Sequence, residues 1–304
     1  MNTIDSQAAK RWQSMPLQAS PWLHDEINRR MQDRLDCITC QPVTWLHWAA
    51  LSGGVEGYES LMQRYPQSVG TVFETSRRRA QIILQQLQQL QQFQQRQPGF
   101  GSDGQTGQEL PLAPHVVTQI EQPVQMLWAN MALHATDAPQ AMMAQWYQAL
   151  EVDGFLMFSC LGTDTLQSLR DLYKASGWPA PAHVFTDMHD WGDMLAAAGF
   201  ANPVMDMERI TLSFTTPERL LQELRGLGRN LHVHRFAALR GRRWYGQLLR
   251  ALAQIPLQLE FEIIYGHAFK PAPRHPVGAR SAISLADMRA ALSQGQTPVP
   301  PPYP

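Results

Sequence analysis

The polar residues best placed for chemistry follow three short apolar runs. Glu74 ends the run SVGTVFE, Asn130 and His134 follow VQMLWA, and Gly53 and Gly54 follow PVTWLHWAAL. In open parallel sheets, ligands bind beyond the carboxyl ends of the strands. A glycine turn there lets a nucleoside approach the backbone, and an acid after the next strand can accept ribose hydroxyls. The pattern predicts a nucleoside site, with the amide of Asn130 facing it and His134 overhanging it.

Each of these side chains also has a structural interpretation. An acid after a strand is often only a surface carboxylate, so Glu74 alone carries little weight. Asn130 is typical of turns, and His134 is typical of a partly buried, hydrogen-bonded histidine. For His134 the structural interpretation is the better one.

The residues that could hold a metal have simpler explanations. Cys37 and Cys40 form a CxxC pair, but a zinc site would need a second pair or nearby histidines. The acids of DMHDWGD, at 187–193, open a predicted helix and can cap its free backbone N–H groups. We expect no metal site.

Composition limits the class of protein. With 304 residues, 44% apolar and 17% charged, the chain is typical of a globular protein. Its 25 basic and 26 acidic residues give a net charge of −1, so no overall field recruits nucleic acid or an anionic membrane. The arginines at 77–79 and 235–243 are expected on solvated helix faces. The N-terminus has no secretory apolar run, and we expect a cytoplasmic protein.

Apolar periodicity predicts alternating strands and helices, which is typical of a mostly parallel α/β sheet covered on both faces. The predicted strands are 42–51, 68–76, 115–120, 124–130, 154–162, 203–214 and 257–269. The predicted helices are 20–38, one around 58–66, 77–97, 138–150, 189–198 and a helical stretch over 217–253. The glycine-rich stretch 98–109 is expected to be a mobile loop, and the proline-rich residues 271–304 an extended or disordered tail.

Several longer motifs carry a family resemblance. They are MALHATDAP (131–139), LEVDGFLMFSCLGTDTLQSLRDLY (150–173), FTDMHDWGDMLAAAGFANPVMDMERITLSF (185–214), LLQELRGLGRNLH (220–232) and LEFEIIYGHAFKP (259–271). In this order they resemble the malonyl-acyl-carrier-protein O-methyltransferases of biotin synthesis, which use S-adenosylmethionine. The resemblance spans most of residues 20–290.

The resemblance implies a Rossmann-like seven-stranded methyltransferase sheet in a domain of residues 1–270, with helices on both faces and a helical lid at about 215–255. It implies that S-adenosylmethionine binds at the loop 47–54, Glu74 and Asn130. The implied substrate is the carboxylate of a malonyl-acyl-carrier-protein thioester or a similar small acid.

The acceptor chemistry needs a cation more than a base. A carboxylate is already a nucleophile, so alignment and desolvation should supply most of the rate enhancement, and the sequence indicates no catalytic residue. Arg225 in the lid can grip a carboxylate through both guanidinium nitrogens. Alternatively, Arg225 pairs with Glu218 or Glu223 on its own helix.

The glycine loop departs from the family pattern of an acid followed by GxGxG. His47 takes the place of the acid, Ala49 and Leu51 replace the first two glycines, and Gly53 remains, with Gly54 beside it. A branched side chain at Leu51 should cost room for the cofactor. The acid expected after the third strand is also missing, with only Glu109 or Asp103 near that position.

Two classes of function follow from this pattern. The first is a working methyltransferase with a rebuilt loop, which the framework slightly favours. The second is a catalytically inactive relative that keeps the fold as a binding or assembly module.

Overall fold

The computed structural model describes the chain except residues 1–2, 16, 18, 97–113, 274–288 and 290–304. The glycine-rich stretch with Asp103 and Glu109, and nearly all of the proline-rich segment, therefore lie outside the described residues. The chain divides into a unit of residues Met1–Lys270 and a second of Pro271–Pro304. All that follows concerns the first unit.

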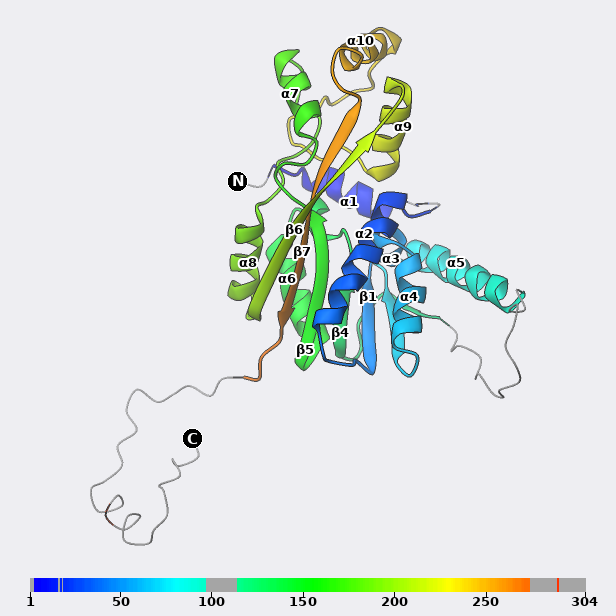
Figure 1. Ribbon diagram of the computed structural model, residues 1–304, viewed down its shortest axis with the longest axis vertical. Coiled ribbons are helices and arrows are strands. Elements are labelled where there is room, and N and C mark those ends of the chain that lie inside the picture. The colour runs from blue at the N-terminus through cyan, green and yellow to red at the C-terminus, as the bar shows by residue number, and fades with distance from the viewer. Residues whose placement is uncertain (1–2, 16, 18, 97–113, 274–288, 290–304) are drawn as a thin grey trace. The chain divides into compact units, whose positions relative to one another are not determined.

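A seven-stranded sheet forms the centre of this unit, in the order β3-β2-β1-β4-β5-β7-β6 (Figure 1). The strands are β1 (Thr44–Trp48), β2 (Val69–Phe73), β3 (His115–Val117), β4 (Val124–Ala129), β5 (Leu150–Leu161), β6 (Ala201–Ser213) and β7 (Gln258–Phe269). The first five strands in the order pair in parallel, and β7 pairs antiparallel with both β5 and β6. The predicted mostly parallel, seven-stranded sheet is confirmed.

The strand order places the site. From β1 the chain runs outward through β2 to β3, and then returns to the other side of β1 with β4 and β5. The strand order therefore reverses between β1 and β4, and a ligand of such a sheet binds beyond the carboxyl ends of these strands.

Alternation along the strands explains why the apolar runs are continuous. Trp45 belongs to the core on one face of the sheet, with Ile27 of helix α2, whereas Leu46 belongs to the core on the other face, with Trp146 of helix α6. Successive side chains of a strand point to opposite faces, so a strand covered on both faces needs apolar residues at every position.

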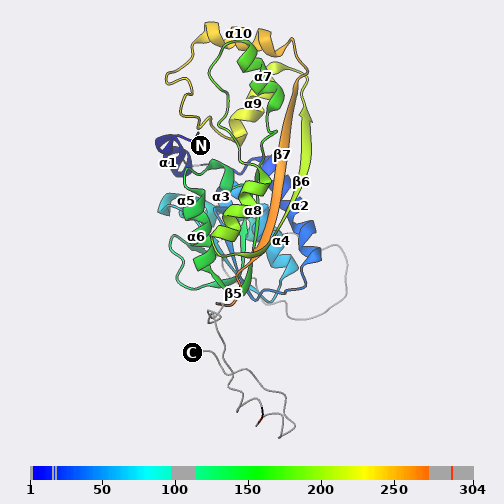
Figure 2. The same cartoon turned by 90° about the vertical axis from the view of Figure 1, so that its left-hand side faces the viewer.

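Helices cover both faces (Figure 2). They are α1 (Ser6–Ser14), α2 (Trp22–Asp33), α3 (Ala50–Gly53), α4 (Glu56–Arg64), α5 (Arg77–Arg96), α6 (Pro139–Ala149), α7 (Gln167–Ala175), α8 (Met188–Ala197), α9 (Pro217–Leu227) and α10 (Arg242–Leu252). Short 3-10 turns follow α2 at Arg34–Cys37 and β4 at Leu133–Ala135. Figures 1 and 2 show α7, α9 and α10 gathered beyond one end of β6 and β7.

The helices differ from the sequence prediction in two respects. The stretch 217–253 forms two helices, because the backbone between Gly228 and Gly241 leaves the helical path. Helices α1 and α7 were not predicted, although Asp5 caps α1 by accepting hydrogen bonds from the amides of Gln7 and Ala8 at 2.8 and 3.0 Å. An Asp before a helix-forming segment is the signal that could have revealed α1.

Candidate cofactor and substrate site

The loop after β1 keeps a glycine-type turn without the glycine. Ala49 has φ 52° and ψ 47°, in the left-handed region, and its carbonyl accepts hydrogen bonds from the amides of Ser52 and Gly53. Left-handed backbone costs a residue with a Cβ roughly 1–2 kcal/mol. The turn that the family builds with glycine is therefore retained here at an energetic cost.

Leu51 ties this loop to the end of β2. Its side chain is fully buried in the core that contains Ile27, and its amide donates a 2.7 Å hydrogen bond to Glu74 Oε1. The bulk of Leu51 is thus absorbed by the core.

Glu74 is buried and already paired. The side chain has no exposed surface, and Glu74 Oε2 accepts a 3.0 Å hydrogen bond from Nε of Arg79, the third residue of α5. Burial raises the pKa of Glu74, while the Arg79 charge and the Leu51 amide act in the opposite direction. Arg79 is itself buried, unlike Arg77 and Arg78, which are exposed as predicted for the arginine group.

Asn130 closes the other end of the site by contacts with the backbone. Its Nδ2 donates to the carbonyl oxygens of Gly53 and of His24, the latter at 2.7 Å. Its Oδ1 accepts a 2.5 Å hydrogen bond from the Ser159 hydroxyl. A Cβ on Gly53 would lie 2.7 Å from the backbone oxygen of Asn130, so this glycine allows the loop and β4 to approach.

Neutral imidazoles lie next to Asn130. Burial, and then the neighbouring His24 and His183, lower the pKa of His134 well below its usual value. Burial also lowers the pKa of His24 to about 4, while its Nδ1 lies 2.6 Å from the Ser52 carbonyl oxygen. His183 Nε2 contacts the His134 carbonyl at 2.7 Å. His134 is therefore uncharged at neutral pH and can offer a hydrogen bond to an acceptor.

Two predicted cofactor contacts face the protein interior. His47 is fully buried inside the sheet, and burial lowers its pKa to about 3. Neither of its ring nitrogens has a hydrogen-bond partner among the described residues. Gly54 has φ 110°, and a Cβ there would lie 2.9 Å from Asp25 Oδ1 of α2, so this glycine serves the packing of α2. The His47 imidazole is therefore enclosed within the sheet and is not presented at the strand ends where Glu74 and Asn130 lie.

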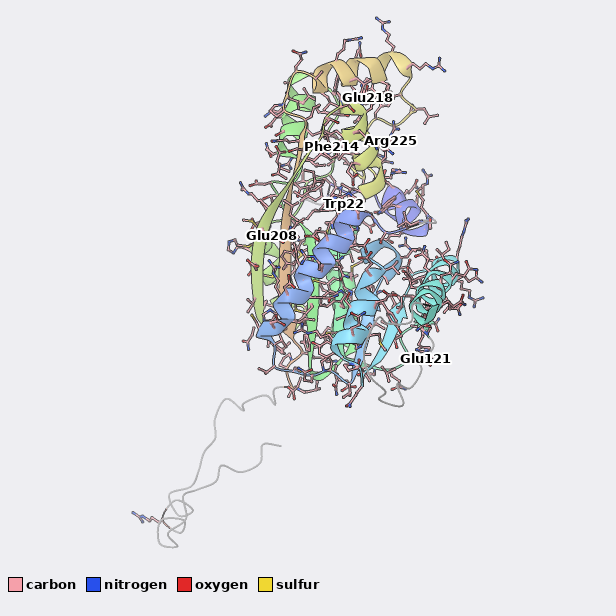
Figure 3. All side chains as sticks on the ribbon, turned by 45° about the vertical axis from the view of Figure 1, so that its right-hand side comes forward. Trp22, Glu121, Glu208, Phe214, Glu218 and Arg225 are labelled. Atoms are coloured by element: carbon pink, nitrogen blue, oxygen red, sulfur yellow. The ribbon has the colours of Figure 1, made fainter. Side chains whose placement is uncertain are left out.

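Arg225 is exposed on α9, above the end of α2 that carries Trp22 (Figure 3). The described residues include no ion pair for it, and Glu223 instead accepts a hydrogen bond from the Trp22 indole. The alternative of a pair with Glu223 is thus not seen.

The acid at the start of α8 is a cap, as predicted: Asp187 accepts a hydrogen bond from the His189 amide at 2.8 Å. Among the described residues no cluster of His, Cys, Asp and Glu suits a metal.

The residues present fit an adenosyl group in their chemistry. A carboxylate offers about four lone-pair sites, and Leu51, Arg79 and the Thr75 amide each take one at Glu74. The ribose hydroxyls need acceptors of this kind. Two cavities lie elsewhere: one of about 370 Å³ beside Trp22 and Glu56, and one of about 270 Å³ beside Tyr173 and Trp244. Neither is lined by Glu74 or Asn130, and because the Glu74 side chain has no exposed surface, the carboxylate is closed off in this conformation.

The strand order and this site define the Rossmann-like methyltransferase fold. A candidate methyltransferase from Bacillus halodurans matches 81% of this chain and 100% of its own with a TM-score of 0.51 at 12% identity. The YcgJ protein of Bacillus subtilis matches 81% and 99% with a TM-score of 0.52 at 10% identity. At these identities the likeness shows the fold alone.

Sequence relatives define the family. A malonyl-[acyl-carrier protein] O-methyltransferase of Gallionella capsiferriformans is 34% identical over 269 residues, covering 84% of this chain and 87% of the relative. The protein of the same name from Laribacter hongkongensis is 34% identical and covers 83% and 84%. No protein-family model matches the chain. The chain belongs to the malonyl-[acyl-carrier protein] O-methyltransferase family, and the predicted resemblance is confirmed.

Proposed function

We propose that this protein is an S-adenosylmethionine-dependent methyltransferase that esterifies the free carboxylate of a malonyl-acyl-carrier-protein thioester in biotin synthesis. The observation that carries the proposal is the 34% identity to a malonyl-[acyl-carrier protein] O-methyltransferase over 84% of the chain. The convergence of Glu74, Gly53 and Asn130 at the switch point of the sheet supports it.

Each end of the site has a task in this proposal. Glu74 accepts the ribose hydroxyls, and the amides of the Ala49–Gly54 loop line the path of the cofactor. Asn130 holds the loop against β4 through the Gly53 carbonyl. When bound, S-adenosylmethionine supplies an electrophilic methyl group on a sulfonium.

The part of the site that binds the acceptor needs a positive charge and the exclusion of water. Arg225 is the proposed partner for the malonyl carboxylate, since a guanidinium binds a carboxylate through two parallel hydrogen bonds. His134, kept neutral by burial, orients the acceptor without competing for protons. The carboxylate is ionised at neutral pH, so no general base is required.

The location and partners follow from the same proposal. Among the described residues no helix is both long and apolar enough to cross a bilayer. We propose a cytoplasmic enzyme whose partner is the acyl carrier protein that presents the malonyl group, with no nucleic acid or membrane partner.

The second candidate is an inactive binding module, and the closure of Glu74 is the observation that bears on it. Glu74 has no exposed surface and forms an ion pair with Arg79, so its carboxylate is not presented to a ligand in this conformation. A binding module would keep this closed state and would use the lid surface to hold its partner.

Methyl transfer from S-adenosylmethionine to malonyl-acyl carrier protein tests the proposal directly, with the methyl ester detected by mass spectrometry. The wild-type protein should form the ester and release S-adenosylhomocysteine. Absence of ester, together with no calorimetric heat for S-adenosylhomocysteine at millimolar concentration, would leave only the binding module.

Arg225→Ala tests the acceptor contact. We expect KM for malonyl-acyl carrier protein to rise about ten-fold or more, because the carboxylate loses a charge-assisted pair, with a smaller effect on kcat. Arg219→Ala, which removes another exposed arginine of α9, is the matched control and should change neither constant. Equal effects of the two substitutions would remove Arg225 from the site.

A further inference from the structure

Arg79 joins three separate elements at the ribose end of the site. It lies in the first turn of α5, its Nε donates to Glu74 Oε2 at 3.0 Å, and its Nη1 donates to the Gln13 carbonyl of α1 at 2.8 Å. The Arg79 side chain is 4% exposed and that of Glu74 is 0% exposed. Arg79 thus links helix α1 to Glu74.

The other end of α1 is fastened to the segment after α9. The Asp5 amide donates to the Leu231 carbonyl at 2.8 Å, and the Asp5 carboxylate pairs with Arg235 at the same distance. At the Gln13 end of α1, Arg229 lies over the ring of Trp12, with its guanidinium carbon 5.6 Å from the centroid. Figure 1 shows α1 between the core and the helices α9 and α10. Through Arg79, α1 connects this segment to Glu74.

The hydrogen bonds at Arg79 are incomplete. Its Nη2 is buried and has no hydrogen-bond partner among the described residues. An unsatisfied buried donor is unfavourable, and more so when it carries charge. Among the described residues, the Arg79 side chain therefore has only the hydrogen bonds to Glu74 and Gln13 to lose when it moves.

A bound ribose and Arg79 compete for the same carboxylate. Glu74 has about four lone-pair sites, and the Leu51 amide, Arg79 and the Thr75 amide take three of them. Two ribose hydroxyls would need more than the site that remains, and the carboxylate has no exposed surface through which they could reach it. The covering groups must therefore move before the ribose binds.

We infer that Arg79 is a clasp that competes with the cofactor for Glu74, and that cofactor entry requires Arg79 to leave Glu74 and to release α1 through the Gln13 carbonyl. The inference rests on the proposed function, because it concerns access of S-adenosylmethionine to that same site. Arg79 acts here as a positioning residue that sets cofactor affinity.

Calorimetry with S-adenosylhomocysteine at pH 8 tests the competition. Arg79→Met removes the charge and both hydrogen bonds and keeps much of the length, so this variant should bind about ten-fold more tightly than the wild type. Arg78→Met, which removes the exposed neighbouring arginine, is the matched control and should bind like the wild type. Equal or weaker binding by folded Arg79→Met would overturn the inference.

Hydrogen exchange on the wild-type protein tests the release of α1 and does not depend on the folding of a variant. Saturating S-adenosylhomocysteine should speed exchange of the α1 amides, residues 6–14, while the amides of β5 stay protected. Unchanged or slower exchange in α1 would contradict the clasp.

The outcomes separate this inference from the proposed function. Binding and methyl transfer that are equal in the wild type and Arg79→Met would keep the function and reject the clasp. Binding by Arg79→Met alone would support the clasp and would reject the function for the wild-type chain as it stands. No binding by either protein would reject both.

Discussion

The two ends of the site are built from different interactions. At the Glu74 end, a buried carboxylate meets a buried guanidinium, whose second link is to the N-terminal helix α1. At the Asn130 end, uncharged groups form the hydrogen bonds. Gly53 lets the loop after β1 pack directly against the backbone that follows β4. Both ends lie at the carboxyl edge of the same parallel strands.

The difference teaches which end can respond to a ligand. A charge pair can exchange one partner for another, because a polar ligand can replace the hydrogen bonds that are lost. The close backbone approach at Gly53 is possible because glycine has no Cβ, and a ligand cannot replace such a packing contact. The Glu74 end is therefore the adjustable part of the site, and the Asn130 end is its fixed frame.

The largest expected effect on stability comes from removing one member of the Glu74–Arg79 ion pair. Glu74→Leu leaves the Arg79 guanidinium buried without its counter-charge and should lower the free energy of unfolding by about 3–5 kcal/mol. The double variant Glu74→Leu/Arg79→Leu should regain most of that loss, since two apolar groups replace the pair. Urea denaturation measures all three proteins. If the double variant is as unstable as the single one, the pair is not an exchangeable unit.

Acidification should lower the free energy of unfolding through the buried His47 of β1. The unfolded chain binds a proton on His47 near the ordinary pKa of 6.5, whereas the folded-state pKa is about 3. Between these values the unfolded state holds more protons, so stability falls as pH falls through this window. His47→Leu should remove roughly 1.5–2 kcal/mol of the loss between pH 6.5 and about pH 5.

Exposed His189 provides the control for this pH dependence. His189→Leu should leave the slope of stability against pH unchanged. Equal slopes in the wild type and His47→Leu would show that His47 takes up a proton without unfolding.

A single added carbon at Gly53, in the Asn130 end of the site, should destabilise the protein. In Gly53→Ala the new Cβ would lie 2.7 Å from the Asn130 backbone oxygen, and we expect a loss of about 1–3 kcal/mol by urea denaturation. Gly226→Ala on α9, where no atom lies within 4 Å of the new Cβ, should be neutral or slightly stabilising. Similar losses at both positions would remove the distinction between a fixed frame and an adjustable end.

The smallest effect is expected at the turn of the loop. Ala49→Gly relieves a left-handed residue and should stabilise the protein by up to about 1 kcal/mol, net of the added freedom of the unfolded chain. Ala50→Gly, one residue later in α3, should instead destabilise it by about 1 kcal/mol. Thermal unfolding compares the two, and changes of the same sign would contradict the strain at Ala49.

Some site features could be predicted from local sequence, and others could not. Glu74 and Asn130 could be predicted to lie at one edge of the sheet, because each follows an apolar strand and the parallel pairing brings such positions together. Arg79 looked like one of three surface arginines, because nothing in the RRR run distinguishes the one that turns inward. Its partner Gln13 contributes a backbone carbonyl, which leaves no trace in side-chain patterns.

The sequence by itself determined the strands, most of the helices, the family and the edge of the sheet at which Glu74 and Asn130 lie, because apolar periodicity and strand-end residues are local signals. Only the tertiary structure decided whether the site is open. Glu74 is closed off by Leu51, Arg79 and a helix that begins at Ser6, and these groups meet only when the sheet and α1 have packed. Availability of a carboxylate depends on burial and on its neighbours in space, and no spacing along the chain encodes either quantity.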